Sequence, residues 1–103
     1  MKVFWTKESL LRLKEIDTYI ARDNLNAAEK FIDKLIEIAE SLVKNPERGR
    51  IVPEFSLHQI RELLYKSYRI VYFIRKSRIE ILTVFEGHQL FKKEVVERAK
   101  NIN

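Results

Sequence analysis

Apolar side chains in the first part of the chain recur with the period of a helix. Four of them stand three or four positions apart, which places them on one helical face: Leu10, Leu13, Ile16 and Ile20. Thr6 precedes this helix as a plausible N-cap, and the run Val3-Phe4-Trp5 before it is typical of a short strand. We therefore expect a strand followed by a helix that ends before Asp23-Asn24.

A second helix is predicted to start near Asn26. Glu29 stands three residues later, as in a capping box. Its apolar positions again follow the helical spacing: Ala28, Phe31, Ile32, Leu35, Ile38, Ala39 and Leu42. Asn45-Pro46 ends it, because proline disfavours a helical conformation in the residue before it. The short break between the two helices predicts an antiparallel helical hairpin.

After a loop over residues 46–56, the hydrophobic period changes from helical to two. Three segments rich in β-branched and aromatic residues are predicted as strands: Ile60 to Tyr65, Tyr68 to Arg75, and Ile79 to Phe85. Lys76-Ser77 forms the turn between the last two, which makes them antiparallel neighbours. Leu90 to Ala99 is predicted as a terminal helix, with an apolar side formed by Leu90, Phe91, Val95 and Val96.

This order of elements predicts an α+β fold, because helices precede a run of strands. We expect an N-terminal strand, an antiparallel two-helix hairpin packed on one face of a mainly antiparallel sheet, and a short C-terminal helix. Residues 1–103 are long enough for one domain. No repeat or linker divides them.

Composition narrows the classes of protein and site. The chain has no cysteine, so disulfides and thiolate metal sites are excluded. With only two histidines, we expect no metal site and no cofactor. The chain shows no signal-peptide pattern and no apolar run of membrane-spanning length, so we expect a soluble cytoplasmic protein without membrane contact.

The net charge of +5 is concentrated in the middle of the chain. Residues 44–76 carry eight basic and three acidic side chains, whereas the flanking segments are close to neutral. A local basic excess attracts phosphates or an acidic protein partner. An ordinary solvated surface of lysine and arginine gives the same pattern.

Three arginines stand within predicted strands: Arg61, Arg69 and Arg75. Side chains alternate between the two faces of a strand, so Arg69 and Arg75 share the face opposite the one that the helical hairpin covers. If that face is open, their guanidinium groups form a candidate phosphate-binding surface. The alternative is pairing across strands with the carboxylates of Glu62, Glu80 or Glu86.

Catalytic motifs are few. His88 follows the last strand, and histidine is a common general acid or base, so it is a candidate for that role, although a solvent-facing loop histidine looks the same. The zinc-protease, Gly-rich phosphate-loop and nucleophile-elbow motifs are missing from the sequence.

Taken together, the segments resemble the RelE/ParE superfamily of toxins along nearly the whole chain. The similarity lies in the order of Trp5-Thr6, Ile16-Asp17-Thr18-Tyr19-Ile20, Asn26-Ala27-Ala28, Asn45-Pro46-Glu47-Arg48-Gly49-Arg50, Ile60-Arg61-Glu62-Leu63 and Tyr68-Arg69-Ile70-Val71-Tyr72. The resemblance implies the toxin of a type II toxin–antitoxin module that stabilises a plasmid or chromosome. It also implies neutralisation by an antitoxin whose acidic, partly disordered C-terminal segment wraps around the toxin.

The resemblance implies two alternative targets. ParE-type members poison DNA gyrase and are not nucleases, and the overall pattern favours this branch. RelE-type members cut mRNA on the ribosome, and the branch that includes YoeB uses a glutamate, an arginine and a histidine. Glu54, Arg69 and His88 stand where those residues would fall, but the C-terminal tyrosine of that branch is missing.

A third interpretation is a degenerate member that only binds its antitoxin or another protein. In every case, the candidate residues for nucleic-acid or antitoxin binding are basic: Arg50, Arg61, Arg69, Arg75 and Lys92.

Overall fold

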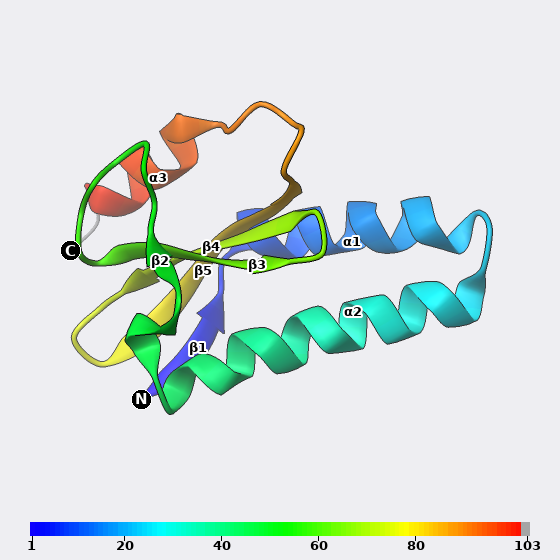
Figure 1. Ribbon diagram of the computed structural model, residues 1–103, viewed down its shortest axis with the longest axis horizontal. Helices are drawn as coiled ribbons and strands as arrows, with labels where there is room; N and C mark the ends of the chain where they lie inside the picture. Colours follow the sequence, from blue (N-terminus) through cyan, green and yellow to red (C-terminus); the bar gives the residue numbers. More distant parts are fainter. Residues whose placement is uncertain (102–103) are drawn as a thin grey trace.

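The computed structural model describes residues 1–101, which form a five-stranded sheet with helices on both of its faces (Figure 1). The elements follow in the order β1 (Lys2–Trp5), α1 (Lys7–Ala21), α2 (Leu25–Glu40), β2 (Arg50–Ile51), β3 (Ile60–Tyr65), β4 (Tyr68–Ile74), β5 (Arg78–Glu86) and α3 (Lys93–Lys100). Two short 3-10 turns, Ser41–Val43 and Pro46–Arg48, connect α2 to β2. The α+β class and the predicted order of elements are confirmed.

The strands lie in the order β1-β5-β4-β3-β2. β3, β4 and β5 form the predicted antiparallel meander, and β1 pairs in parallel with β5. β2 lies inside the segment predicted as a loop and was not predicted. β2 has only two residues, Arg50 and Ile51, paired with Glu62 and Arg61 of β3. Two residues are too few to produce a period-two pattern, so no local signal reveals this strand.

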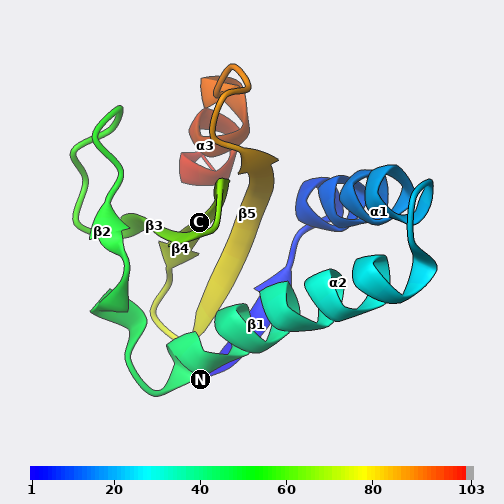
Figure 2. The same ribbon diagram turned by 45° about the vertical axis from the view of Figure 1, so that its right-hand side comes forward.

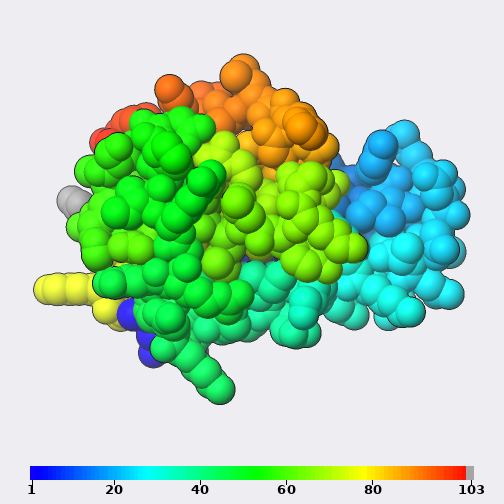
Figure 3. Space-filling view, viewed as in Figure 1, coloured from blue at the N-terminus to red at the C-terminus, as the bar shows by residue number. Residues whose placement is uncertain are grey.

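One face of the sheet packs on the hairpin of α1 and α2. Figure 2 separates the layers, with β5 standing between the hairpin and α3. The β4 side chains at positions 68, 70, 72 and 74 face the hairpin, as the alternation predicted. Leu35 and Ala39 of α2 are fully buried against them. The space-filling view shows the far end of the hairpin projecting beyond the sheet as a separate lobe (Figure 3).

The opposite face, predicted to be a candidate phosphate surface if open, is covered. α3 and the loop before β3 pack on it and form a second core that includes Val52, Val71, Phe91 and Val96. The covering groups are α3, only eight residues long, and an irregular loop. The apolar side of the terminal helix was predicted, but the face of the sheet on which it packs is set by the irregular segment before it and was not predicted.

Several local predictions need correction. The N-cap of α2 is Asn24, whose side chain accepts from the backbone N–H of Ala27 at 2.9 Å, so the capping box at Asn26 does not form. Leu10 is 53% exposed, whereas the neighbouring Ser9 is fully buried. Leu90 is 88% exposed, since α3 begins only at Lys93 and Phe91 alone reaches the core from this segment.

Tyr72 ties the loop after α2 to the sheet. Its hydroxyl accepts from the backbone N–H of Gly49 at 2.9 Å and donates to the carbonyl of Pro46 at 2.6 Å. Gly49 approaches so closely that a Cβ there would lie 2.6 Å from the carbonyl oxygen of Glu62 and 2.7 Å from the Tyr72 hydroxyl. Position 49 therefore has no room for a side chain.

We expect Gly49→Ala to lower the free energy of unfolding by about 2 kcal/mol, because the added methyl group displaces the β3 backbone or the tyrosine. Urea unfolding of the purified protein measures the loss. Gly87→Ala is the matched control, since a Cβ there would meet only the Ser67 carbonyl, at 3.1 Å. Equal losses in the two variants would contradict this account of Gly49.

Candidate functional site

Four charged residues gather on the α3 side of the sheet and form what we call the arginine–glutamate cluster: Arg50, Glu54, Glu62 and Arg69. Strand register brings three of them together. Arg50 stands directly opposite Glu62 on the neighbouring strand, and Arg69 projects from β4 on the same face. Glu54 reaches the cluster from the turn that follows Pro53.

All three nitrogens of the Arg69 guanidinium group donate hydrogen bonds within the protein. Nε donates to Oε1 of Glu62 at 2.5 Å, while Nη1 and Nη2 donate to the two oxygens of Glu54 at 3.3 and 3.1 Å. The guanidinium carbon lies 5.1 Å from the ring centre of Phe85 and 5.0 Å from that of Phe91. The side chain is only 14% exposed. Arg69 therefore has little capacity left for a phosphate.

Glu62 is the buried centre of the cluster, with a side chain that is 0% exposed. One oxygen accepts from Arg69, and the other accepts from Nε of Arg50 at 2.6 Å. Arg50 itself is 58% exposed. Of the two arginines, Arg50 therefore offers the more accessible positive charge to a partner.

Glu54 is held in its charged form. The hydrogen bonds from Arg69 lower the pKa of its carboxyl below the usual 4.5, against the opposing effect of partial burial, and the charge of Lys93 adds to the lowering. Burial disfavours the charged form of Arg69, but its bonds to the two glutamates outweigh this effect and raise the pKa of the guanidinium. Lowering the pKa of a carboxylate weakens it as a general base.

The third residue of the candidate catalytic set lies elsewhere. His88 stands in the exposed turn after β5, where its backbone N–H donates to Glu86 at 2.6 Å. Within residues 1–101, its imidazole makes no hydrogen bond or ion pair. The structure thus brings Glu54 and Arg69 together and leaves His88 outside their contacts.

The remaining predicted binding arginines face the protein. Arg61 is buried and donates to the backbone carbonyls of Gly49, His58 and Glu47 at 2.9, 3.0 and 3.2 Å, so it holds the loop between α2 and β3. Arg75 pairs with Glu80 at 3.1 Å and donates to the carbonyl of Ala99 at 2.6 Å. Lys92, by contrast, is exposed in the segment before α3.

Sequence reasoning considered Glu62 only as an alternative ion-pair partner. The adjacent charged residues Arg61 and Glu62 within the otherwise apolar run of β3 were the available signal for its central position. Phe91, which helps to cover Arg69, gave no such signal. Within the described part of the chain, no three metal-ligating side chains converge, and no helix is both long and apolar enough to cross a membrane.

We expect Arg69→Met to lower the free energy of unfolding by about 3 kcal/mol, because Glu62 would then be a buried carboxylate with only one arginine partner. The double variant Arg69→Met with Glu62→Leu should lose roughly 2 kcal/mol less than the sum of the losses in the two single variants. A double-mutant cycle by urea unfolding measures this coupling. Strictly additive losses would show that the pair is not coupled.

Glu54→Gln should reduce stability at pH 7 by about 1 kcal/mol or less, since the ion pair is partly exposed. The folded-state pKa of Glu54 lies below its unfolded value near 4.5. Its contribution is therefore complete above about pH 4.5 and is lost as the pH falls through the folded-state pKa.

The measurement is the difference in unfolding free energy between Glu54→Gln and the unsubstituted protein, followed from pH 7 to pH 3. Glu40→Gln is the control, because Glu40 is exposed and makes no ion pair among residues 1–101. A difference that stays constant over this pH range would contradict the assignment.

Comparison with known proteins gives a consistent result. Residues 3–91 match the family model described as the ParE toxin of the type II toxin–antitoxin system parDE. Protein Y4kP of Sinorhizobium fredii (strain NBRC 101917 / NGR234), a toxin candidate by its name, is 33% identical over 89 residues, covering 85% of this chain and 90% of that protein.

A solved structure titled as the chromosomal ParDE TA system from P. aeruginosa has a similar fold. Its TM-score is 0.69 at 20% identity, over 84% of this chain and 95% of the matched chain. The family match spans most of the chain, and the similarity to Y4kP covers almost the same length. This chain therefore belongs to the ParE toxin family of type II toxin–antitoxin systems.

Proposed function

We propose that this toxin acts by inhibiting DNA gyrase and is not a nuclease. Membership of the ParE family supports this target, because ParE-type toxins are gyrase poisons. The proposal places the protein in the cytoplasm, where gyrase works, in a module that stabilises a plasmid or chromosome.

The observation that carries the proposal is that all three guanidinium nitrogens of Arg69 donate to carboxylates of the protein. In the alternative, a ribosome-dependent mRNA endoribonuclease, this arginine would stabilise the charge that develops on the scissile phosphate. Its three nitrogens instead donate to Glu54 and Glu62, and two phenylalanine rings lie against it. An entering phosphate would have to displace carboxylates from an arginine that is already neutralised.

The requirements for proton transfer also favour gyrase inhibition over RNA cleavage. Cleavage of RNA through the ribose 2′-hydroxyl needs a base to accept its proton and an acid to protonate the leaving oxygen. Glu54 has a lowered pKa, which weakens it as a base. His88 makes no contact with Glu54 or Arg69 among the hydrogen bonds and ion pairs of residues 1–101.

The partner in the proposal is a cognate antitoxin with an acidic segment that folds on binding. The basic middle segment offers exposed cations at several places for contact with this acidic antitoxin segment: Lys44, Arg48, Arg50, Lys66 and Lys76. Lys92 adds a further exposed charge outside it. Arg61, Arg69 and Arg75 are largely enclosed, so in this proposal they act mainly by shaping the surface.

The test compares the unsubstituted protein with His88→Ala. We expect both proteins to abolish supercoiling by purified gyrase and to accumulate cleaved plasmid DNA to the same extent. The reason is that the His88 imidazole is exposed and makes no hydrogen bond or ion pair within residues 1–101. After induction without antitoxin, the 5′ ends of cellular mRNA should show no new cuts.

Normal supercoiling at a large excess of toxin would overturn the gyrase proposal. New cuts at a fixed place within codons, lost in His88→Ala, would establish the nuclease alternative. Binding to the antitoxin with neither activity would identify a degenerate member.

A further inference from the structure

Exposed cations gather at one end of the molecule, where the turn between β4 and β5, the start of β1 and the segment after α2 meet. We call this group the basic end, and it consists of Lys2, Lys44, Lys76 and Arg78. Figures 1 and 2 both place the three segments at the same end of the molecule. Figure 3 shows the β4–β5 turn, in yellow, projecting beside the blue N-terminal residues.

Strand pairing and packing bring these cations together from distant parts of the sequence. Lys2 of β1 stands directly opposite Arg78 of β5. Lys76 lies in the turn between β4 and β5, two residues before Arg78. The 3-10 turn Ser41–Val43 contacts β1, and Lys44 follows it directly. The basic end is therefore a product of the fold, since its members are far apart along the chain.

Arg78 is held in place by its neighbours and remains accessible. Its guanidinium carbon lies 4.6 Å from the ring centre of Phe4, and Nη2 lies 2.5 Å from a carboxylate oxygen of Glu80. The side chain is still 47% exposed. Glu80 also pairs with Arg75 at 3.1 Å, so one carboxylate serves two guanidinium groups and positive charge remains. A cation that is already oriented loses little side-chain entropy when a phosphate binds.

The three lysines of the basic end carry unpaired charge within residues 1–101. In this part of the chain, the lysines that form ion pairs lie in α2 and α3. Glu40 is exposed at the end of α2, but it makes no ion pair with Lys44. The side chain of Glu80 is only 8% exposed, and both of its oxygens face arginines. Positive charge therefore dominates this surface.

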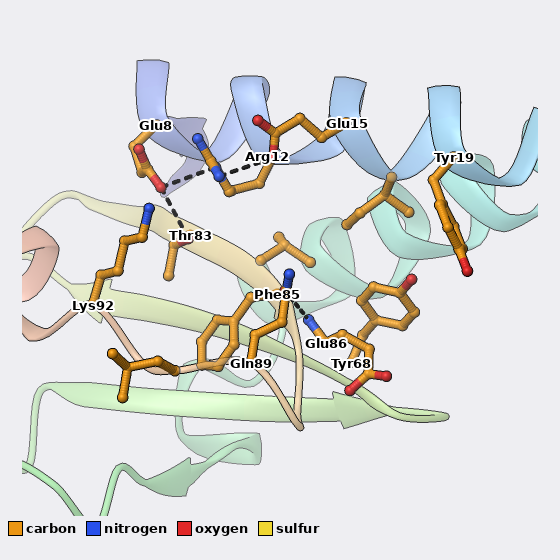
Figure 4. A pocket seen from close by; sticks show the side chains of 13 residues that line it. Glu8, Arg12, Glu15, Tyr19, Tyr68, Thr83, Phe85, Glu86, Gln89 and Lys92 are labelled. Carbon is orange, nitrogen blue, oxygen red and sulfur yellow. Dashed lines mark hydrogen bonds and ion pairs between the residues drawn. The ribbon is translucent and has the colours of Figure 1, made fainter.

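The pocket beside α1 has a different balance of charge (Figure 4). It has a volume of about 540 Å³ and lies between α1, the end of β5 and the segment before α3. Its lining contains three carboxylates, from Glu8, Glu15 and Glu86, and two cations, from Arg12 and Lys92. Arg12 lies 3.1 Å from Glu8 and 2.8 Å from Glu15. A phosphate would meet a net negative charge in this pocket, so the basic end suits a phosphate better.

We propose that the basic end binds the phosphate backbone of duplex DNA, the DNA on which gyrase acts. The inference rests on the proposed inhibition of gyrase, because it makes the toxin contact the enzyme and its DNA together. Such a double contact stabilises the complex in which the DNA is cleaved. The contacts are to phosphates, so they carry no preference for base sequence.

The composition of the surface favours DNA over a protein partner. Lysine is depleted at protein–protein interfaces, whereas lysine and arginine are leading phosphate ligands in proteins that bind DNA. A duplex carries one charge per about 1.7 Å of its axis, which is about twice the density of a single strand. Lys44 and Lys76 are also among the cations available to the acidic antitoxin segment, so the experiment has to separate the two partners.

The experiment measures the affinity of the purified toxin for a fluorescently labelled DNA duplex of mixed sequence, from about 0.05 to about 0.2 M NaCl. About four phosphate contacts predict a slope of about −3.6 when the logarithm of the affinity is plotted against that of the salt concentration. Replacing Lys2, Lys44 and Lys76 together by glutamine should reduce the slope to about −1. At about 0.1 M NaCl, this triple variant should bind on the order of a hundredfold more weakly.

A matched control replaces Lys7, Lys14 and Lys30 by glutamine. These lysines are exposed on the helical hairpin and make no ion pair within residues 1–101, so the control has the same net charge as the first triple variant. It should bind the duplex within about twofold of the unsubstituted protein, because distant charges are screened by salt. Urea unfolding checks that both variants are folded. Equal losses of affinity would reflect net charge alone and would overturn the assignment.

Gyrase and antitoxin assays on the same variants identify the partner. The variant at the basic end should need roughly tenfold more toxin to accumulate cleaved plasmid DNA and should keep its affinity for the antitoxin. If it loses affinity for the antitoxin and keeps its affinity for the duplex, the surface belongs to the antitoxin. Tighter binding of a single-stranded RNA than of the duplex would assign the surface to RNA. Either result overturns the inference.

Failure of this inference is separable from failure of the proposed function. If the unsubstituted toxin accumulates cleaved DNA with gyrase, and the variant at the basic end does so equally well, the inference is wrong and the gyrase proposal stands. If the toxin binds the duplex through the basic end but leaves supercoiling normal, the gyrase proposal fails and the DNA-binding surface is retained.

Discussion

The carboxylate of Glu62 has no exposed surface and lies on the α3 side of the sheet. Burying a carboxylate in this way is costly unless cations pair with it. Arg50 and Arg69 come from the strands on either side of β3, so both neighbours must keep their register for the charge to be shared. A shift of one residue would turn these side chains to the opposite face. The ion pairs therefore constrain strand register as well as the local electrostatics.

The same constraint explains why a two-residue strand persists. β2 has few backbone hydrogen bonds of its own, but Arg50 is anchored to Glu62 and the adjoining loop is fixed by Arg61 and Tyr72. Gly49 allows the chain to pass close enough for both contacts. Charge pairing, close backbone approach and hydrogen bonding thus act on one short segment and hold Glu54 over Arg69.

Periodicity predicted the main elements because each buries a regular apolar face. The hairpin pattern around Leu13 and Leu35 and the alternation in β4 are local properties of the sequence. The cover over Arg69 could not be predicted in this way, since Phe91 and Glu54 reach it from irregular segments. The pocket beside α1 was not predictable from the sequence either, because Tyr19 and Glu86 come to line it only through the packing of α1 beside β5.

The position of Arg69 affects how its substitution is interpreted. A loss of toxicity on removing this arginine would ordinarily suggest a role in catalysis. Here the same change leaves the buried Glu62 with a single partner and removes the contact that holds Glu54, so a folding defect gives the same phenotype. His88 does not share this ambiguity, since its imidazole is exposed and unpaired within residues 1–101. Substituting His88 therefore discriminates between gyrase inhibition and RNA cleavage better than substituting Arg69.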